Sequence, residues 1–303
     1  SSQNSMLLSS VTTATGSDLV YEASSTPRVT IRTLPGGTSF ELKTLGLSCG
    51  PCDLVIDADL TEKIRETLRR HIESASKANV SNGAVVIIKL PENELLAIVG
   101  SPNPGRMTAG GQLNMAIEPR PIGSTAKPFI YLNAFVKGAR PYTLIDDVEY
   151  SYTIGTGFAF YPKNFDGKFM GTVTLHNALS NSRNIPAVKT LEYVGLPEFY
   201  NFLRESLGFT SRQPLERYEL GIALGALEMD LLTLSHFFTI FPNEGMLKPL
   251  TMEKTKQGLF QTPMEKRLDG EKRVADTAFV QLINKILSDR EMAVEQFGLR
   301  SNL

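Results

Sequence analysis

Tryptophan is absent from the 303-residue sequence, and histidine occurs only three times. His71, His176 and His236 lie far apart and show no metal-ligand spacing, so the sequence predicts neither a metal site nor a cofactor. The 31 basic and 32 acidic residues leave a net charge of −1. Without an excess of positive charge, a nucleic-acid partner is disfavoured. Hydrophobic residues make up 42% of the chain, enough for a sizeable core.

Long apolar runs are also missing. The richest stretches, Val85 to Leu90 and Leu95 to Val99, have the length of strands and not of membrane spans. Residues 1–10 lack the basic start and the continuous apolar centre of a signal peptide. We therefore expect a fragment of a larger protein, with membrane contact only through a segment absent from this sequence.

Cysteine occurs twice, in the tetrapeptide Cys49-Gly50-Pro51-Cys52. Thioredoxins carry this tetrapeptide with the first thiolate near a helix N-terminus. Here the preceding segment is rich in Gly, Ser and Thr, and Asp53 to Leu60 is typical of a strand. The alternative to a redox site is a small surface loop, which an oxidising compartment would allow to close as a disulfide.

The first 48 residues are polar, with short alternating stretches that predict short strands or a linker. Ile64, Leu68 and Ile72 then recur at helical spacing, and Asp59 or Thr61 is positioned to cap that helix. Two apolar runs, residues 84–88 and 95–99, predict a hairpin covered on both faces. Residues 100–111 form a Gly- and Pro-rich loop.

The chain after Ser124 is mostly helical in pattern. An aromatic, Gly-rich stretch at residues 146–171 interrupts it and predicts an ordered excursion. The predicted helices span residues 124–136, 174–181, 185–193, 197–207, 229–241 and 275–288. A short sheet element followed by a helical lobe favours an α/β fold of the α+β type.

Pro121 and Gly123 break the chain directly before the first of these helices, which places Ser124 near a helix N-terminus. Free backbone N–H groups and the positive end of the helix dipole then lie beside its hydroxyl. Lys127 lies one turn further on the same face, and a lysine with a lowered pKa is able to activate a serine. Alternatively, Ser124 is an ordinary N-cap and Lys127 is solvated.

A second candidate element is Ser182-Arg183-Asn184, between two helical patterns. Pro186 fits the first turn of the later helix and leaves this tripeptide in the connection. Ser182 would relay a proton to a leaving amine, and Asn184 would hold Lys127 and a substrate amide. The alternative is that Asn184 caps the later helix and Ser182 is a turn residue.

Both elements, in this order, resemble the Ser-x-x-Lys and Ser-x-Asn motifs of active-site serine penicillin-recognising enzymes. The flanking residues sharpen the resemblance to the transpeptidase domain of class A penicillin-binding proteins. The stretches that carry it are Ile56 to Leu60, Arg120 to Phe129, Tyr161 to Gly167, Val173 to Val188, Leu224 to Glu228 and Phe241 to Gly245.

The resemblance implies an antiparallel sheet flanked by helices, with a helical lobe, over residues 53–303, and a linker or short-strand region over residues 1–52. It also implies acyl transfer. Ser124 would attack a peptidoglycan stem peptide ending in D-Ala-D-Ala, and Lys127 would take its proton. β-Lactams would acylate Ser124 in the same way. The implied location is extracytoplasmic, in the periplasm or on the outer face of the cell membrane.

The family's third motif, Lys-Thr/Ser-Gly, is missing from the sequence. The nearest string is Lys254-Thr255-Lys256-Gln257-Gly258, which lacks the Gly after Thr255 and comes before the predicted 275–288 helix. We therefore expect the given sequence to omit a C-terminal part of the parent protein, which would contain this motif and the last strands of the sheet.

Two further interpretations stay open. One is a non-catalytic peptidoglycan-binding or β-lactam-sensing module, which the missing motif favours. The other is a serine β-lactamase, against which stands the absence of the Glu-x-x-Leu-Asn segment that one class uses for deacylation.

Overall fold

The computed structural model describes residues 10–12, 18–20, 29–30, 41–42, 44–45, 51–52, 54–107, 110–153, 157, 159–252 and 270–298. The chain divides into two compact units. Unit 1 contains Ser1–Pro119, Asp230–Thr239 and Lys248–Glu271, and unit 2 contains Arg120–Met229, Ile240–Leu247 and Lys272–Leu303.

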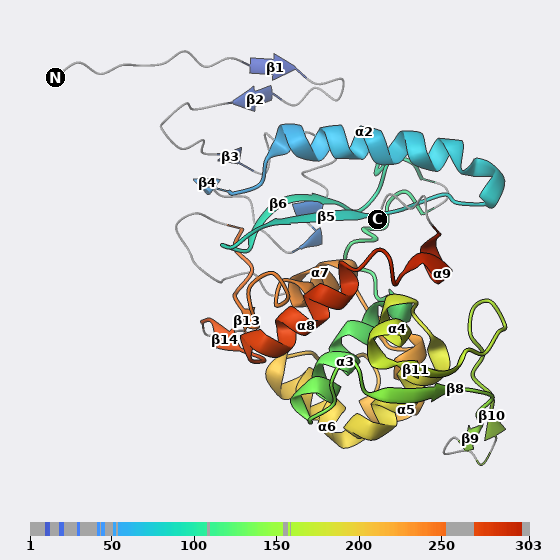
Figure 1. Ribbon diagram of the computed structural model, residues 1–303. Coiled ribbons are helices and arrows are strands. Elements are labelled where there is room, and N and C mark those ends of the chain that lie inside the picture. The colour runs from blue at the N-terminus through green and yellow to red at the C-terminus, as the bar shows by residue number, and fades with distance from the viewer. Residues whose placement is uncertain are drawn as a thin grey trace. The chain divides into compact units, whose positions relative to one another are not determined.

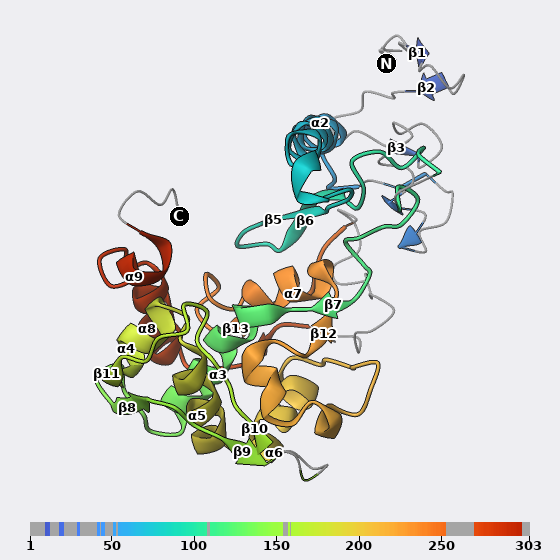
Figure 2. The same cartoon turned by 90° about the vertical axis from the view of Figure 1, so that its right-hand side faces the viewer.

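Unit 1 is built on an antiparallel hairpin of β5 (Val85–Lys89) and β6 (Glu94–Val99), paired from Val85↔Val99 to Lys89↔Glu94. The long helix α2 (Ala58–Ser74) and the helix α7 (Leu231–Phe238) lie on opposite faces of this hairpin (Figures 1 and 2). The sequence-based expectation of a hairpin covered on both faces is therefore confirmed.

The start of α2 differs from the prediction. The N-cap is Asp57, whose carboxylate accepts from the Leu60 N–H at 2.8 Å, and not Asp59 or Thr61. The Thr61 hydroxyl donates instead to the Asp57 carbonyl at 2.7 Å. Asp57 alone combines an extended backbone with a side chain in reach of a free helix N–H. The helix therefore begins at Ala58, and the prediction of a strand up to Leu60 is wrong from that residue on.

The core of unit 1 joins residues from distant parts of the chain. Its buried members are Leu42, Leu45, Leu54, Ile56, Leu95, Ile98, Ala116, Leu232, Leu250 and Met252. Beside it, the buried Glu41 carboxylate pairs with Arg65 of α2 at 2.8 Å and also accepts from the Gly100 N–H at 3.0 Å. Residues before position 53 thus contribute to this core, and the boundary at 52/53 stays a prediction.

Short strand pairs form the remainder of the described part before α2. β1 (Ser10–Thr12) pairs with β2 (Asp18–Val20), and β3 (Val29–Thr30) pairs with β4 (Pro51–Cys52). The prediction of short strands is confirmed for these pairs, whereas Glu41 and Leu42, in the same predicted region, are helical. Cys49 lies outside the described residues, so the redox site and the closed loop both stay predictions.

Unit 2 is mostly helical, and its central helix α3 (Lys127–Val136) is buried along nearly its whole length. The other helices of unit 2 are α4 (Leu175–Ser180), α5 (Asn184–Val194), α6 (Leu196–Asn201), α8 (Thr277–Leu287) and α9 (Val294–Phe297). Shorter helical turns are η3 (Gly123–Ala126), η4 (Phe202–Ser206), η5 (Leu215–Arg217) and η6 (Glu219–Leu224). In Figure 1, α4, α5 and α8 lie around α3, and α9 lies apart from it.

The predicted helices of both units are confirmed, with ends shifted by a few residues, since α4 and α8 are shorter than predicted and α5 is one residue longer at each end. Residues 197–207 form α6 and a π-helical turn, η4. The helix predicted over residues 229–241 begins only after Asp230, whose side chain caps α7 by accepting from the Thr233 N–H at 2.8 Å. Capping side chains fix the starts of α4 and α7, and hydrophobic periodicity alone does not locate them.

The predicted excursion is ordered over its described residues. Its two ends pair as β8 (Leu144–Asp147) and β11 (Gly171–Thr174), and a smaller pair, β9 (Tyr152–Thr153) and β10 (Ala159–Phe160), lies further out. Two more pairs complete unit 2. They are β7 (Arg120–Pro121) with β12 (Glu228–Met229), and β13 (Met246–Leu247) with β14 (Lys272–Arg273).

Candidate active site

Ser124 lies in the short helical turn η3, directly before α3, and its side chain is exposed. The preceding residues are fixed by main-chain bonds to the η6–β12 connection. Ile122 N–H donates to Leu227 O at 3.0 Å, and Gly123 N–H donates to Gly225 O at 3.2 Å. The prediction that Ser124 stands near the N-terminus of a helix is therefore confirmed.

Two glycines allow this close approach. Gly123 and Gly225 have φ values of +59° and +82°, in the region that favours glycine. A Cβ on Gly225 would lie 2.0 Å from the Cα of Gly123, which is a clash with backbone. The main chain that presents Ser124 thus requires glycine, a residue without a Cβ, at position 225.

Lys127 is the first residue of α3 and is only 1% exposed. Its Nζ donates to Ser182 O at 2.6 Å, to Ser182 Oγ at 3.1 Å and to Asn184 Oδ1 at 2.7 Å. Burial, and secondarily the nearby Arg183 cation, lower the pKa of Lys127 to about 7. Near neutral pH the amine therefore exists in both charge states, as a proton carrier requires.

Ser182 lies in the turn between α4 and α5, and Asn184 is the first residue of α5. Ser182 has a φ of +51°, and its N–H donates to Leu179 O at 3.0 Å. The Asn184 side chain bridges two segments, because Nδ2 donates to Lys163 O at 2.7 Å while Oδ1 accepts from Lys127. Pro186 lies in the first turn of α5, as predicted.

The N-terminus of α5 is not capped by Asn184. The Oδ1 of Asn164, 20 residues upstream, accepts from the Asn184 N–H at 2.7 Å. The alternative interpretation of Asn184 as the N-cap is therefore wrong. The N-cap residue is Arg183, and the Asn184 side chain bonds to Lys127 instead of to the start of the helix.

Three of the four predicted site residues therefore meet at one amine, that of Lys127. Ser124 lies one turn earlier on the chain, and within the described residues its hydroxyl has no hydrogen-bond partner. In apo structures catalytic hydrogen bonds are often long and tighten when substrate binds. The geometry leaves the Ser124 hydroxyl exposed beside a buried amine of lowered pKa.

An ion-pair network, buried at Arg183 and Asp147 and exposed at Asp166, adjoins the Ser182 turn. Arg183 donates through Nε to Asp147 Oδ2 at 2.8 Å and through Nη1 to Asp166 Oδ2 at 3.0 Å. Asn164 Nδ2 donates to Asp147 Oδ1 at 2.7 Å. A backbone hydrogen bond from Lys168, and then Arg183, lower the pKa of Asp166. The network fixes the excursion to the turn that holds Asn184.

Sequence reasoning assigned no role to Asp147, Asn164, Arg183 or Gly225. Asn164, Arg183 and Gly225 lie in stretches that carry the family resemblance, which is the signal that marks them. Asp147 lies outside those stretches, at the end of β8, and no sequence pattern marks it. Its importance shows only in the structure, where the carboxylate is completely buried. The near match to the third motif, Lys254 to Gly258, lies outside the described residues.

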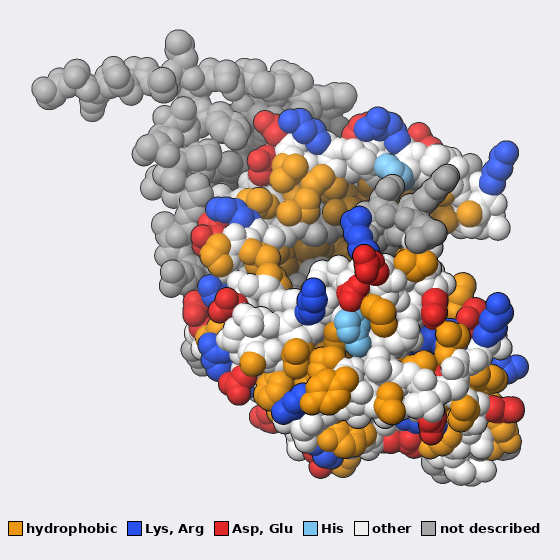
Figure 3. All heavy atoms as spheres, viewed as in Figure 1, with side chains coloured by type: hydrophobic (Ala, Val, Ile, Leu, Met, Phe, Trp, Pro, Cys, Tyr) orange, Lys and Arg blue, Asp and Glu red, His pale blue; other side chains and the backbone are white. Residues whose placement is uncertain are grey.

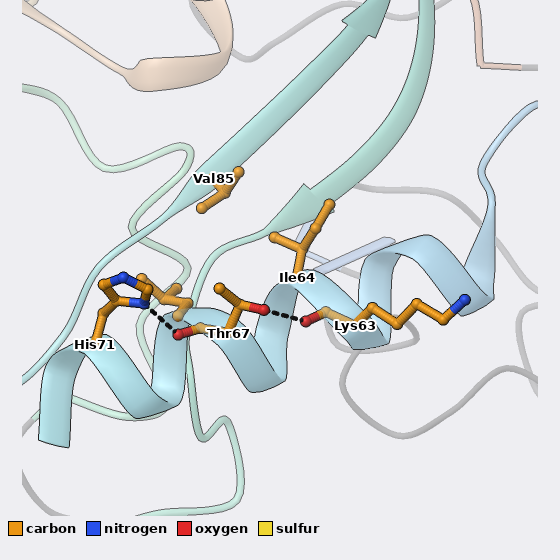
Figure 4. A pocket seen from close by; sticks show the side chains of 6 residues that line it. Lys63, Ile64, Thr67, His71 and Val85 are labelled. Carbon is orange, nitrogen blue, oxygen red and sulfur yellow. Dashed lines mark hydrogen bonds between the residues drawn. The ribbon is translucent and has the colours of Figure 1, made fainter. Parts of the chain in front are cut away.

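Other candidate sites are weaker. A groove of about 410 Å³ in unit 1 is lined by Ile64, Leu68, His71 and Val85, together with Lys63 and Thr67 (Figure 4). His71 Nδ1 is bonded to Thr67 O at 2.8 Å, and Thr67 donates to Lys63 O at 2.9 Å. These polar atoms are engaged within the helix, so the groove presents a mainly apolar surface.

The described part of the chain contains neither a candidate metal site nor a candidate membrane span. No group of His, Cys, Asp or Glu there is placed to hold a metal ion. None of the helices described is long and apolar enough to cross a bilayer. On the face displayed in Figure 3, basic and acidic side chains are interspersed, without a large patch of one sign.

Residues 83–293 match the family model described as the penicillin binding protein transpeptidase domain. Penicillin-binding protein 1A of Aquifex aeolicus is 35% identical over 175 residues, which cover 57% of this chain and 23% of that protein. The protein of the same name from Neisseria gonorrhoeae is 30% identical over 225 residues, which cover 70% and 27%. The chain thus spans about a quarter of the length of these relatives.

Solved structures show the same fold. Penicillin-binding protein 1A from Haemophilus influenzae aligns with a TM-score of 0.57 and 21% identity, over 69% of this chain and 35% of that one. The transpeptidase domain of penicillin-binding protein 3 from Burkholderia pseudomallei aligns with a TM-score of 0.58 and 20% identity, over 80% and 70%. The α/β fold predicted from the sequence is confirmed, and the chain belongs to the family of penicillin-binding protein transpeptidase domains of the class A type.

Proposed function

We propose that the chain is a serine-type D,D-transpeptidase that cross-links peptidoglycan stem peptides through an acyl-enzyme on Ser124. The observation that carries this proposal is the Lys127 amine, which is buried, held by Ser182 and Asn184, and lowered in pKa to about 7. A serine hydroxyl is a weak nucleophile and needs such a base beside it.

In the proposed reaction, Ser124 Oγ attacks the carbonyl carbon of the penultimate D-Ala and passes its proton to Lys127. The tetrahedral intermediate collapses by breaking the peptide bond, and D-Ala leaves as the amine with a proton relayed through Ser182. An amine of a second stem peptide then attacks the ester, loses a proton and frees Ser124. The Ser124 N–H serves as one donor to the oxyanion, an interaction of about 3–4 kcal/mol in other acyl-transfer sites.

The partners follow from this chemistry. They are stem peptides as donor and acceptor, and β-lactams, whose strained amide acylates the same hydroxyl. Peptidoglycan lies outside the cytoplasmic membrane, so the proposed location is extracytoplasmic. No nucleic acid takes part. Asn184 would hold both Lys127 and the amide of the bound peptide.

The first test is to incubate the chain with benzylpenicillin and record its intact mass. We expect one adduct, located on the peptide that contains Ser124, and none in Ser124→Ala. The matched control is Ser288→Ala, an exposed serine at the end of α8, which should be acylated like the unmodified protein.

A second measurement separates the alternatives. Release of D-Ala from a pentapeptide donor, with transfer of the acyl group to an added D-amino acid, supports the transpeptidase. A stable adduct without D-Ala release would instead indicate a β-lactam sensor, and rapid loss of the adduct would indicate a β-lactamase. A folded protein with no adduct would refute the acyl-enzyme proposal.

A further inference from the structure

The middle residue of the Ser182-Arg183-Asn184 turn has no part in the reaction proposed above, yet it is among the most constrained side chains of unit 2. Arg183 is 4% exposed and Asp147, its main partner, is fully buried. The guanidinium contacts Asp147 through Nε and Nη2, both 2.8 Å from Oδ2. A buried arginine retains its charge, so it needs such a partner.

The same guanidinium reaches the excursion. Nη1 donates to Asp166 Oδ2 at 3.0 Å, and Nη2 donates to Lys168 O at 2.6 Å. Asp147 also accepts from the Met170 N–H at 3.1 Å. One side chain therefore ties the turn that carries Ser182 and Asn184 to β8 and to residues 166–170.

Arg183 is also the charged side chain that acts electrostatically on Lys127. Its backbone lies between the two residues that bind the Lys127 amine, and its cation is, after burial, the second cause of the lowered pKa of Lys127. Other charged side chains on elements around α3 are not among those causes. They are Asp147, Lys163, Asp166, Lys168, Lys189, Glu192, Glu219 and Lys285.

We propose that Arg183, anchored by Asp147, is a positioning residue of the acylation site that holds Ser182 and Asn184 around the Lys127 amine and keeps a second cation beside it. This inference rests on the proposed role of Lys127 as the base. It assigns two tasks to one side chain. The fork of hydrogen bonds fixes the geometry of the turn, and the charge disfavours the protonated amine.

The test is a titration of Lys127 by NMR in protein labelled with ¹³C-lysine, with the resonance assigned from its loss in Lys127→Met. In Arg183→Gln we expect the pKa of Lys127 to rise by about one unit. Because this change leaves Asp147 buried without its partner, the double variant Asp147→Asn/Arg183→Gln is measured as well, and it should show the same rise. Arg204→Gln removes an arginine from an exposed ion pair with Glu216 and should change nothing.

The pH profile of penicillin acylation is the second readout. Its midpoint should move to higher pH with the pKa of Lys127 in both Arg183→Gln variants. Arg183→Lys keeps the charge without the fork, so the midpoint should stay while the rate falls roughly tenfold. A folded double variant with the pKa and rate of the unmodified protein would overturn the proposal. Absence of acylation in the unmodified protein would refute the proposed function, and the NMR titration would still decide the effect of Arg183 on Lys127.

Discussion

The Nζ of Lys127 lies 2.7 Å from Oδ1 of Asn184, a residue 57 positions further along the chain. The first residue of one buried helix thus meets the first residue of another. The Asn184 side chain thus provides a hydrogen-bond acceptor for an amine that is only 1% exposed. This contact turns two short motifs, each common by chance, into one site.

Loss of the Lys127 amine should abolish acylation while the fold persists. We expect Lys127→Met to lower the rate of penicillin acylation at least about a hundredfold, because a positioned general base contributes that much or more. Stopped-flow fluorescence with a fluorescent penicillin measures the rate. Lys189→Met on α5 is the control and should acylate normally. A Lys127→Met protein with an unchanged rate would exclude lysine as the base.

Acylation should depend on pH through the same group. The pKa of Lys127 is lowered to about 7, so the amine is neutral and able to accept a proton only above that pH. We expect the rate to rise with pH and to reach half its maximum near pH 7. A profile that is flat from pH 5 to 9 would contradict this assignment.

The same lowered pKa links stability to pH. Between about 7 and 10.5 the unfolded lysine binds a proton that the folded one does not. The contribution of Lys127 to the free energy of unfolding therefore rises with pH in that window and is constant below it. Urea unfolding at several pH values gives the free energy of unfolding as a function of pH. Between about pH 7 and 10.5 this free energy should rise less steeply with pH in Lys127→Met than in the unmodified protein.

Asn164 is expected to be a stability residue as well as a support for Asn184. Asn164→Ala leaves the buried Asp147 carboxylate and the Asn184 N–H each short of a partner. We expect a loss of roughly 1–3 kcal/mol in the free energy of unfolding. The exposed Asn201→Ala should stay within about 0.5 kcal/mol of the unmodified protein. Equal stabilities of the two variants would show that the Asn164 bonds contribute nothing.

Gly225→Ala should disturb the main chain that presents Ser124. A Cβ at this position meets the backbone of Gly123, and φ is +82°. We expect slower acylation and a loss of stability greater than the roughly 1 kcal/mol of backbone strain alone. Gly138→Ala is the matched control, since φ is +118° there but the nearest atom is 3.8 Å away. A Gly225→Ala protein that acylates at the rate of the control would refute this role.

In unit 1, Glu41 should be required for the stability of the packing around α2. Glu41→Gln removes one charge of the buried pair with Arg65 and should cost about 3–5 kcal/mol. Glu66→Gln, which removes the exposed partner of Arg69, should cost less than about 1 kcal/mol. Thermal unfolding monitored by circular dichroism compares the two, and similar midpoints would contradict the expected difference.

Much of the fold could be predicted because its helices and hairpin carry periodic apolar residues. The helical spacing of Ile64, Leu68 and Ile72 predicts α2. Two apolar runs separated by a turn predict β5 and β6. The helix starts could not be placed as well. Several capping residues stand near the beginning of α2, and only the backbone geometry selects Asp57 over Asp59.

The residues that surround the site were harder to predict than the site itself. Ser124, Lys127, Ser182 and Asn184 stand in two recognisable motifs. Their supports come from elsewhere, since Asp147 lies 36 residues before its partner Arg183. Such pairing depends on how β8 and the excursion fold back on the turn, and periodicity within one segment contains no information about it.

The N-terminal cap that Asn164 supplies to α5 has a dynamic consequence. The Asn184 amide proton is protected only while the excursion is docked, because its acceptor belongs to that segment and not to the helix. Hydrogen exchange at this single amide therefore reports opening of residues 163–170, separately from the later amides of α5. The exchange rate of the Asn184 amide thus measures local opening at the site in the absence of substrate or inhibitor.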